Sequence, residues 1–482
     1  MTGRVMEEWT WLPHYDESHR PPDEQEQWFP TRETMPAEQR DELILARIRE
    51  VMDYAWERSA FYRRKWDEAG VHPSSIRTLE DFERVPVVRK DELRADQAAH
   101  EPFGSYLCVD VHDVKHVNGT SGTTGRPTAF GICERDWRSI ANAHARVLWA
   151  MGVRPSDVVL IGSPLSLYMG SWGIYVGAER LGARVFPLGA GTTGQTARTV
   201  RWMQQMAVTV FYGTPSYALR VIEVAEAEGI DPARLGIRKL VFSGEPGASV
   251  PSIRSRIVEG FGGAEVYDSG SMAEVTPWMN LAAASDGPGM LCWQDLVYTE
   301  VCDPLALTRV PYGAQGTPVY TTLERISQPM IRLLSNDLTR WEAPSAERGR
   351  TYPFLPQGVY GRIDDMFVVR GENVYPSAID DVLMAEAGYG GEHRIVISRD
   401  GAMDALAVQV EHLATITGRA LDEMLARMSD RLRTVLGVGA TVVPVPQFTF
   451  DRTEFKSRRV VDDRTLLNQV MATDLAAAEG SR

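Results

Sequence analysis

Residues 117–131, VNGTSGTTGRPTAFG, combine the residue types that can hold a phosphate group. Glycine lets the backbone approach a ligand closely, and consecutive N–H groups in such a turn form a nest for an anion. Hydroxyl groups and the planar guanidinium of Arg126 add donors suited to phosphate oxygens. The segment is not the P-loop of nucleoside triphosphatases, because the Gly-x-x-x-x-Gly-Lys-Ser/Thr spacing is absent and Pro127 blocks continuation into a helix. On composition alone, a flexible linker explains the segment equally well.

A phosphate loop needs a rigid frame, and the sequence predicts one in which strands alternate with helices. Apolar residues at helical spacing predict a helix over residues 37–70. From about residue 104, β-branched runs precede helical patterns several times, which is typical of an α/β fold with parallel strands. Ligands bind beyond the carboxyl ends of such strands. The expected ligand site is therefore made by the polar loops at these ends, GSP, GTPS, SGEPG and YDSGSMAE.

The length of the chain, 482 residues, is too great for one compact core. Residues 290–345 have the pattern of strands, and a β-α-β-β-α pattern follows that suits a small separate domain. We therefore predict two domains, a large one over residues 1–363 and a smaller lid domain over residues 364–482.

The charge balance, with 51 basic and 65 acidic residues and a net charge of −14, argues against a nucleic-acid partner. The acidic N-terminal stretch lacks the apolar core of a secretory signal, and proline, glycine and charge interrupt the later apolar stretches before they reach membrane-spanning length. The cysteines lack metal-ligand or C-x-x-C spacing: Cys108, Cys133, Cys292 and Cys302. We expect a cytoplasmic protein with reduced thiols and no membrane partner.

The loop TSGTTGRPT resembles the signature loop of the adenylate-forming enzymes, the superfamily of acyl-CoA synthetases, peptide-synthetase adenylation domains and luciferases. The chain is more closely similar to the phenylacetate-CoA ligase-like branch, in segments that run in order from about residue 40 to 465. These segments are VMDYAWERSAFYRRKWDEAGV, GVRPSDVV, GAERLGARVFPLG, TPSYAL, FSGEP, GRIDDMFVVRGENVYPSAID and FKSRRVVD.

This resemblance implies an α/β fold with a large N-terminal domain of parallel and mixed sheets, a β-subdomain, and a small mobile α+β C-terminal domain. It also implies an aryl or arylacetic acid–CoA ligase, an acid–thiol ligase that forms an acyl-adenylate and then an acyl-CoA thioester. ATP, Mg²⁺ and coenzyme A are the implied cofactors and co-substrates, and AMP and pyrophosphate are the implied products.

The resemblance implies a set of ATP-binding residues. The β- and γ-phosphates are assigned to Thr120, Ser121, Gly122, Thr123, Thr124, Gly125 and Arg126. The adenine, the ribose and the surrounding loop are assigned to Ser243, Gly244, Glu245, Pro246, Tyr267, Asp268, Asp337 and Arg362. Tyr267 is expected to stack on the adenine, and the Asp337 carboxylate suits the two ribose hydroxyls as an acceptor.

The resemblance also implies the residues that carry the chemistry. Glu274 aligns with the glutamate that holds Mg²⁺, a hard cation that prefers carboxylate oxygen. Lys456 aligns with the C-terminal lysine that bridges the acyl carboxylate and the α-phosphate, and its loss should slow adenylation on the order of 10²–10³-fold. Asp364, or its neighbour Asp365, matches the hinge of the small domain.

Aromatic residues and glycines define the predicted acyl pocket, which should be lined by Tyr168, Gly170, Trp172 and Tyr217. Such a lining suits a flat apolar acid, so the sequence predicts an aryl or arylacetic carboxylate. Three arginines are candidates for the phosphates of coenzyme A: Arg370, Arg458 and Arg459.

The chain departs from the family pattern at three positions. Phe455 replaces the usual glycine before the lysine, and Asn118 replaces a histidine common just before the signature loop. Trp172 stands where relatives often have a smaller residue, which would shorten the pocket, so phenylacetate itself is not assigned.

Other interpretations stay open on the residues alone. Glu274 and Lys456 also suit a solvated surface, Asp337 a turn, and Tyr168 and Trp172 the core. A carrier-protein phosphopantetheine thiol is an alternative acceptor to coenzyme A. A catalytically silent nucleotide-binding protein is a third hypothesis, and the sequence leaves a homodimer open.

Overall fold

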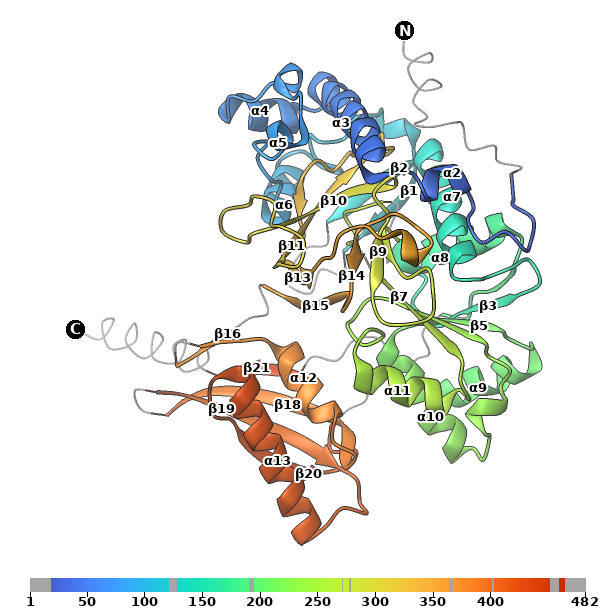
Figure 1. The fold of residues 1–482 in the computed structure, drawn as a ribbon, viewed down its shortest axis with the longest axis vertical. Coiled ribbons are helices and arrows are strands. Elements are labelled where there is room, and N and C mark those ends of the chain that lie inside the picture. The colour runs from blue at the N-terminus through green and yellow to red at the C-terminus, as the bar shows by residue number, and fades with distance from the viewer. Residues whose placement is uncertain are drawn as a thin grey trace, which may run out of the picture. The chain divides into compact units, whose positions relative to one another are not determined.

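The computed structural model describes residues 19–120, 128–167, 169–189, 195–270, 272–276, 279–363, 367–370, 372–400, 403–450 and 459–463. The chain divides into two compact units, Met1–Tyr360 and Gly361–Arg482, whose elements are labelled in Figure 1. Within the described ranges, no helix is both long enough and apolar enough to span a bilayer.

An eight-stranded sheet forms the centre of the first unit, with the order β14-β9-β8-β7-β6-β5-β3-β4 (Figure 1). The strands from β7 to β4 pair in parallel: β3 Val158–Ile161, β4 Arg184–Phe186, β5 Val210–Gly213, β6 Lys239–Phe242 and β7 Glu265–Gly270. The remaining strands pair antiparallel: β8 Leu281–Ala282, β9 Met290–Cys292 and β14 Phe354–Leu355. The parallel strands are short apolar runs such as VVLI and VFYG, because helices bury both of their faces.

One face of this sheet is covered by α7 (Glu134–Ala150) and α8 (Met169–Leu181), which share a core with Val159, Ile161 and Val210. Three further helices pack against one another over the other face: α9 Thr196–Gln205, α10 Pro215–Ala227 and α11 Pro251–Gly260 (Figure 1). Tyr217 of α10 lies on this second face, with its ring centroid 6.0 Å from that of Phe211 in β5. The predicted α/β class, with strands and helices in alternation, is confirmed.

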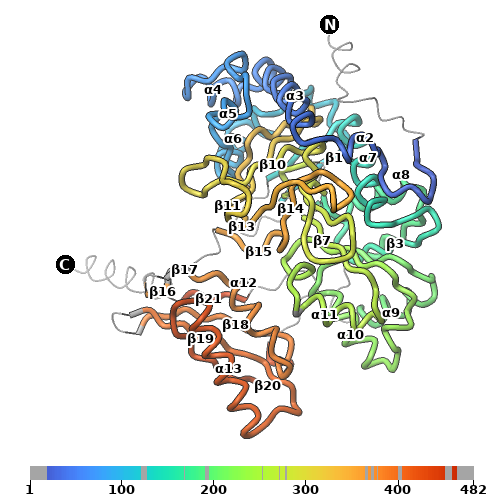
Figure 2. Tube along the Cα trace, viewed as in Figure 1, coloured from blue at the N-terminus to red at the C-terminus, as the bar shows by residue number. Residues whose placement is uncertain are grey.

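A second sheet has the order β10-β11-β13-β15, with β12 paired to β11. Its strands are β10 Val297–Cys302, β11 Gln315–Thr322, β12 Leu333–Leu334, β13 Asp337–Arg340 and β15 Val359–Arg362. The N-terminal helices lie beside β10 and β11 in both views (Figures 1 and 2): α3 Ala37–Arg58, α4 Ala60–Glu68, α5 Leu79–Phe82 and α6 Lys90–Ala99. Ile48, Trp66, Tyr298 and Tyr320 share one buried core, so segments far apart in the sequence pack together here.

The helix predicted over residues 37–70 is two helices, α3 and α4, with Ser59 between them. The backbone of Ser59 is extended, with φ −110° and ψ 115°. Its hydroxyl oxygen accepts a hydrogen bond from the Tyr62 N–H at 3.1 Å, which caps the second helix. The hydrophobic spacing continues across this break, so periodicity alone did not reveal it.

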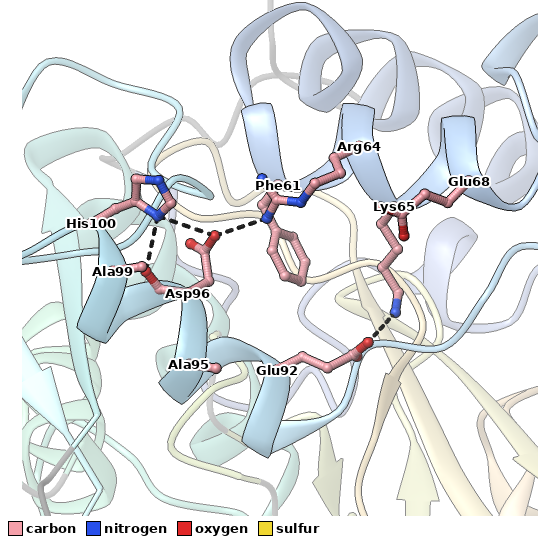
Figure 3. A pocket seen from close by; sticks show the side chains of 9 residues that line it. All are labelled: Phe61, Arg64, Lys65, Glu68, Glu92, Ala95, Asp96, Ala99 and His100. Carbon is pink, nitrogen blue, oxygen red and sulfur yellow. Dashed lines mark hydrogen bonds and ion pairs between the residues drawn. The ribbon is translucent and has the colours of Figure 1, made fainter.

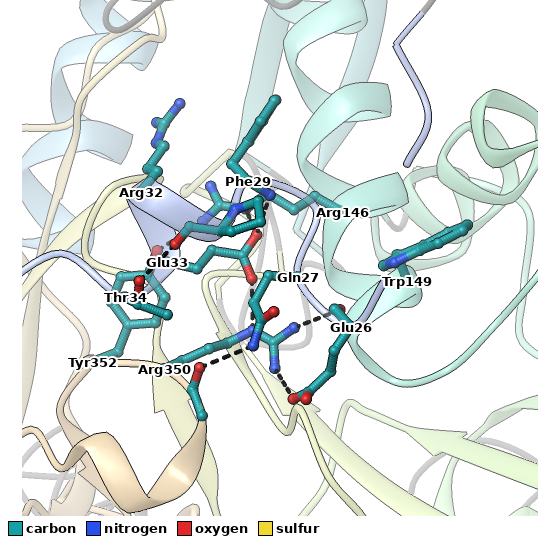
Figure 4. A network of polar contacts seen from close by, with 12 residues as sticks. Glu26, Gln27, Phe29, Arg32, Glu33, Thr34, Arg146, Trp149, Arg350 and Tyr352 are labelled. Carbon is teal, nitrogen blue, oxygen red and sulfur yellow. Dashed lines mark hydrogen bonds and ion pairs between the residues drawn. The ribbon is translucent and has the colours of Figure 1, made fainter. Parts of the chain in front are cut away.

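A buried ion network ties α2 (Pro30–Glu33) to the rest of the first unit (Figure 4). Glu33 accepts from Arg146 Nε at 2.9 Å and from Arg350 Nε at 2.7 Å. Asp295 accepts from Arg146 Nη1 at 2.8 Å and from the Tyr352 hydroxyl at 2.8 Å. Although burial opposes its ionisation, Arg146 and Arg32 hold the pKa of Asp295 well below its usual range. We call Glu33, Arg146, Asp295, Arg350 and Tyr352 the N-terminal ion network.

The second unit contains a four-stranded sheet with the order β20-β19-β18-β21. Its strands are β18 Tyr389–Asp400, β19 Met403–His412, β20 Thr441–Pro446 and β21 Val460–Asp462. The hairpin of β16 (Phe367–Val369) and β17 (Glu372–Val374) precedes α12 (Pro376–Met384), and α13 (Arg419–Leu436) lies between β19 and β20 in the chain. Met424, Met428, Leu432 and Leu436 are the buried residues of α13, one helical turn apart along a single face.

Candidate active site

The parallel strands of the central sheet end together at one edge. The register pairs Ile161 with Tyr212, Gly213 with Phe242, and Phe242 with Asp268, so β3, β5, β6 and β7 stop at nearly the same level. We call this edge, with the residues that directly follow these strands, the carboxyl edge. The loops GSP, GTPS and SGEPG therefore start side by side, as the sequence predicts, whereas the first four residues of YDSGSMAE belong to β7.

The signature loop starts at the end of a hairpin made by β1 (Val114–Gly119) and β2 (Ala129–Cys133). Thr120 N donates to Thr128 O at 3.1 Å, and Thr128 N donates to Thr120 Oγ1 at 3.1 Å. A Cβ at Gly119 would lie 2.8 Å from Thr128 O, so this close approach of the strands requires glycine. The other predicted phosphate contacts lie outside the described residues: Ser121, Gly122, Thr123, Thr124, Gly125 and Arg126.

Glu274 is 3% exposed and lies four residues after β7. Lys90 Nζ, at the start of α6, is 3.6 Å from Glu274 Oε1, and Arg325 Nη1 donates to the Glu274 carbonyl oxygen at 2.6 Å. No cluster of three or more acidic, histidine or cysteine ligands exists among the described residues. A single buried carboxylate fits Mg²⁺, which is commonly held by one or two carboxylates together with substrate phosphates. Glu274 would hold the ion, which would supply positive charge beside the phosphates.

The loop Ser243–Pro246 leaves β6 at the carboxyl edge. Gly244 has φ +93°, a left-handed conformation that favours glycine. The Glu245 carboxylate accepts from the Ser216 N–H at 2.7 Å in the first turn of α10, so this side chain fixes the loop to the helix. Ser243 is buried, and its hydroxyl has no hydrogen-bond partner within the described ranges.

Tyr267 and Asp268 lie within β7 and point to opposite faces of the sheet. The Tyr267 hydroxyl donates to Glu265 Oε2 at 2.6 Å, toward the start of the strand and away from the carboxyl edge. That placement does not support adenine stacking by Tyr267, because its ring is packed inside the core that the central sheet shares with α7 and α8. Asp268 is fully buried, and burial raises its pKa to about 7, although the Ser249 hydroxyl donates to it at 2.5 Å.

Asp337 and Arg362, the predicted ribose contacts, lie in the second sheet. Asp337 begins β13, and its N–H donates to Ser335 Oγ at 3.0 Å. The preceding Asn336 has φ +60°, so the chain turns sharply into the strand. Arg362 ends β15 and is half-buried. The ribose role remains a prediction for both residues.

The predicted acyl-pocket residues fall into two packing layers. Gly170 and Trp172 are in the first turn of α8, and Trp172 Nε1 donates to Ser166 O at 2.8 Å. Tyr217 is fully buried on the opposite face of the sheet, where its hydroxyl bonds Thr199 Oγ1 at 3.3 Å. The structure thus brings Gly170 and Trp172 together but separates Tyr217 from them. Tyr168 lies outside the described residues.

Two of the predicted contacts to coenzyme A, Arg370 and Arg459, are described in the second unit, and their role stays a prediction. Arg459 is bound by Glu392 at 2.6 Å and lies 3.6 Å from Asp380. Although burial disfavours its charge, these carboxylates hold the pKa of Arg459 above its usual value. Two carboxylates of the same unit thus already pair with Arg459, so a phosphate of coenzyme A would compete with them for its guanidinium. Arg370 is exposed, with φ +53°, and donates to Asp404 O at 2.8 Å.

Lys456, Arg458, Asp364 and Asp365 lie outside the described residues. Their proposed roles in adenylation, coenzyme A binding and domain rotation remain predictions from the family resemblance.

Three residues at or near the carboxyl edge were missed by sequence reasoning: Lys90, Arg325 and Asn280. Lys90 and Arg325 reach Glu274 only through the fold, from α6 and from the segment after β11. Asn280 precedes β8, and both polar atoms of its buried side chain lack a partner among the residues described. No local signal in the sequence marks any of these three residues.

A separate groove of about 370 Å³ lies between α4 and α6 (Figure 3). Its charges are paired with one another, since Lys65 Nζ is 2.6 Å from Glu92 and Arg64 Nη2 is 3.1 Å from Asp96. Because these cations already have anionic partners, the groove offers an incoming phosphate little free positive charge.

The comparisons with known proteins agree with this arrangement. The family model of the AMP-binding enzyme matches residues 65–319, and that of the AMP-binding enzyme C-terminal domain matches residues 371–464. Phenylacetate-coenzyme A ligase of Thermus thermophilus is 32% identical over 90% of this chain and 99% of its own. The Escherichia coli ligase of the same name is 31% identical over 90% and 97%.

A solved structure of 2-hydroxyisobutyryl-CoA ligase in complex with 2-HIB-AMP is 56% identical, with a TM-score of 0.91. The match covers 97% of this chain and 99% of the chain of that ligase. The chain therefore belongs to the adenylate-forming AMP-binding enzymes, in their phenylacetate-CoA ligase-like branch, and is an acyl-CoA ligase that works through an acyl-adenylate with ATP, Mg²⁺ and coenzyme A.

Proposed function

We propose that this enzyme joins a short, branched hydroxy acid to coenzyme A. The observation that carries this proposal is the 56% identity, over 97% of the chain, to a ligase named for 2-hydroxyisobutyrate. Identity to the phenylacetate ligases of Thermus thermophilus and Escherichia coli is lower, at 32% and 31%.

The packing of Trp172 supports a small acid. Its indole is held by the hydrogen bond to Ser166 O at 2.8 Å, and its ring centroid is 6.5 Å from that of Trp137 and 6.1 Å from that of Tyr175. A large ring held in this way, beside Gly170, takes up volume at the start of α8 that an aromatic substrate would need.

In the proposed reaction, a carboxylate oxygen of the acid attacks the α-phosphorus of ATP. The bond from the α-phosphorus to the oxygen that bridges to the β-phosphate breaks, and pyrophosphate leaves. The coenzyme A thiol then loses its proton to water, and its sulfur attacks the acyl carbon. The bond from that carbon to the phosphate oxygen of AMP breaks, and AMP leaves. Lys456 offsets the charge that builds between the acid carboxylate and the α-phosphate, and Glu274 would hold Mg²⁺, which would supply positive charge beside the phosphates.

An aryl or arylacetic acid is the second candidate. Trp137 and Tyr175, the aromatic neighbours of Trp172, favour it, since they present flat apolar surfaces. The name shared by the curated relatives favours it as well.

A panel of acids tests the proposal. Purified enzyme with ATP, Mg²⁺ and coenzyme A should release AMP with 2-hydroxyisobutyrate at a higher kcat/KM than with phenylacetate or benzoate. Higher kcat/KM for an aromatic acid would establish the second candidate instead. Release of ADP and phosphate would contradict the adenylation chemistry itself.

A further inference from the structure

The side chain of Asn280 is buried and has no hydrogen-bond partner among the residues that the structure describes. The residue is 0% exposed, and neither its Oδ1 nor its Nδ2 has a partner within the described part of the chain. Asn142, another buried asparagine, shows the usual arrangement, since its Oδ1 accepts from Arg180 Nε at 2.8 Å. Leaving a buried carboxamide unpaired costs stability, so Asn280 needs an explanation.

Asn280 lies at the carboxyl edge. In the antiparallel pair of β7 and β8, Gly270 is opposite Leu281 and Ser269 is opposite Ala282. Asn280 directly precedes Leu281 and therefore stands level with the end of β7, where the strand leads toward Glu274. Its backbone carbonyl accepts from Trp293 N at 2.9 Å, which holds the residue in place.

Two hydroxyls in the same region share this property. Ser243 Oγ, directly after β6, and Thr276 Oγ1, two residues after Glu274, are buried and unpartnered within the described ranges. Protein interiors normally pair such groups with protein atoms or water. These three side chains, which lack partners within the described ranges, follow β6, follow β7 and precede β8, so a polar ligand at the carboxyl edge would complete them.

We propose that Asn280 binds the hydroxyl group of the acyl substrate and selects hydroxy acids over acids that lack this group. A carboxamide both donates and accepts, and so does a hydroxyl, so either orientation pairs them. This inference rests on the proposed function and adds the residue that recognises the hydroxyl. An acid with a methyl group in the same place would leave Asn280 unpaired, and such a mismatch discriminates strongly.

The test compares two acids of similar shape in wild type and Asn280→Leu. The first is 2-hydroxyisobutyrate, and the second is 2,2-dimethylpropanoate, in which a methyl group replaces the hydroxyl. The readout is kcat/KM in acid-dependent exchange of pyrophosphate into ATP. We expect Asn280→Leu to lower the ratio of the two kcat/KM values about 10- to 100-fold. The variant should keep or raise the melting temperature, because an unpaired polar group becomes apolar.

Asn142→Leu is the matched control. It removes a paired buried asparagine, so it should lower the melting temperature and leave the substrate ratio unchanged.

Two outcomes overturn the inference, and they differ. If wild type prefers the hydroxy acid and Asn280→Leu keeps that preference, water pairs with Asn280, and this residue does not bind the hydroxyl of the substrate. If wild type exchanges pyrophosphate but shows no preference for the hydroxy acid, the proposed substrate class fails and the inference fails with it.

Discussion

The N-terminal ion network and the carboxyl edge are both buried and polar, but they differ in how their polar groups are satisfied. In the network, Arg146 contacts Glu33 and Asp295 at 2.9 and 2.8 Å, and its remaining nitrogen donates to Tyr352 at 2.7 Å. At the carboxyl edge, Ser243, Thr276 and Asn280 present polar atoms without a partner among the described residues. Paired buried groups hold the fold together, whereas these three at the carboxyl edge are the groups that we propose a ligand pairs.

The largest expected effect is on the fold. Arg146→Met should lower the free energy of unfolding by about 3–5 kcal/mol, because it leaves the buried carboxylates of Glu33 and Asp295 without their shared partner. Urea denaturation followed by circular dichroism measures this change. A loss below about 1 kcal/mol would show that the network contributes no more than a surface pair does.

Loss of Lys456 should affect catalysis and leave the fold unchanged. Lys456→Ala should slow adenylation about 10²–10³-fold, because the charge that builds at the α-phosphate loses its ammonium. Pyrophosphate exchange measures this half-reaction. Thioester formation from a synthetic acyl-adenylate and coenzyme A should stay near the wild-type rate. Equal loss of both half-reactions would contradict the assigned role.

The pH dependence of stability also tests the comparison, because His144 of α7 is a buried polar side chain. It packs against Gly173 and Gly177 of α8, where a Cβ would lie 2.3 and 2.4 Å from the histidine. Burial lowers the pKa of His144 to about 4 from 6.5, so the unfolded chain binds a proton that the folded protein excludes. Stability should therefore be retained above pH 6.5 and fall by about 3 kcal/mol as the pH drops to 4.

Urea denaturation at pH 7 and pH 4 measures this loss. His144→Leu should show a smaller acid loss than wild type, whereas His112→Leu, at an exposed position, should not change it. An unchanged acid loss in His144→Leu would show that other groups cause it.

The smallest effect is expected in the groove of Figure 3. Lys65→Ala removes the partner of Glu92, at 2.6 Å and near the surface, and should change stability by less than about 1 kcal/mol. It should leave the kcat/KM for pyrophosphate exchange unchanged, so it is also the control for Lys456→Ala. A strong loss of activity in this variant would show that the groove takes part in substrate binding.

Many of the strands and helices could be predicted from the sequence, because the hydrophobic periodicities that indicate them are local. The runs VVLI, VFYG and KLVF became β3, β5 and β6, and the polar loops after them converge at one edge. The break at Ser59 was missed, because its cap interrupts a hydrophobic pattern that continues on both sides.

Side-chain partners were predicted less well, because tertiary contacts decide them. Arg459 resembles a free cation in the sequence but is bound by Glu392 and Asp380 from other elements of its unit. Tyr267 stands at a plausible place for adenine, but its hydroxyl is held by Glu265. Lys90 and Asn280 became candidates only when the fold placed them beside Glu274 and at the end of β7.

The most direct test of the account is exchange of labelled pyrophosphate into ATP in the presence of 2-hydroxyisobutyrate, with wild type and Lys456→Ala side by side. The account predicts exchange that depends on the acid and on Mg²⁺ in wild type, reduced about 10²–10³-fold in the variant. Absence of acid-dependent exchange in wild type, or full exchange in Lys456→Ala, would contradict it.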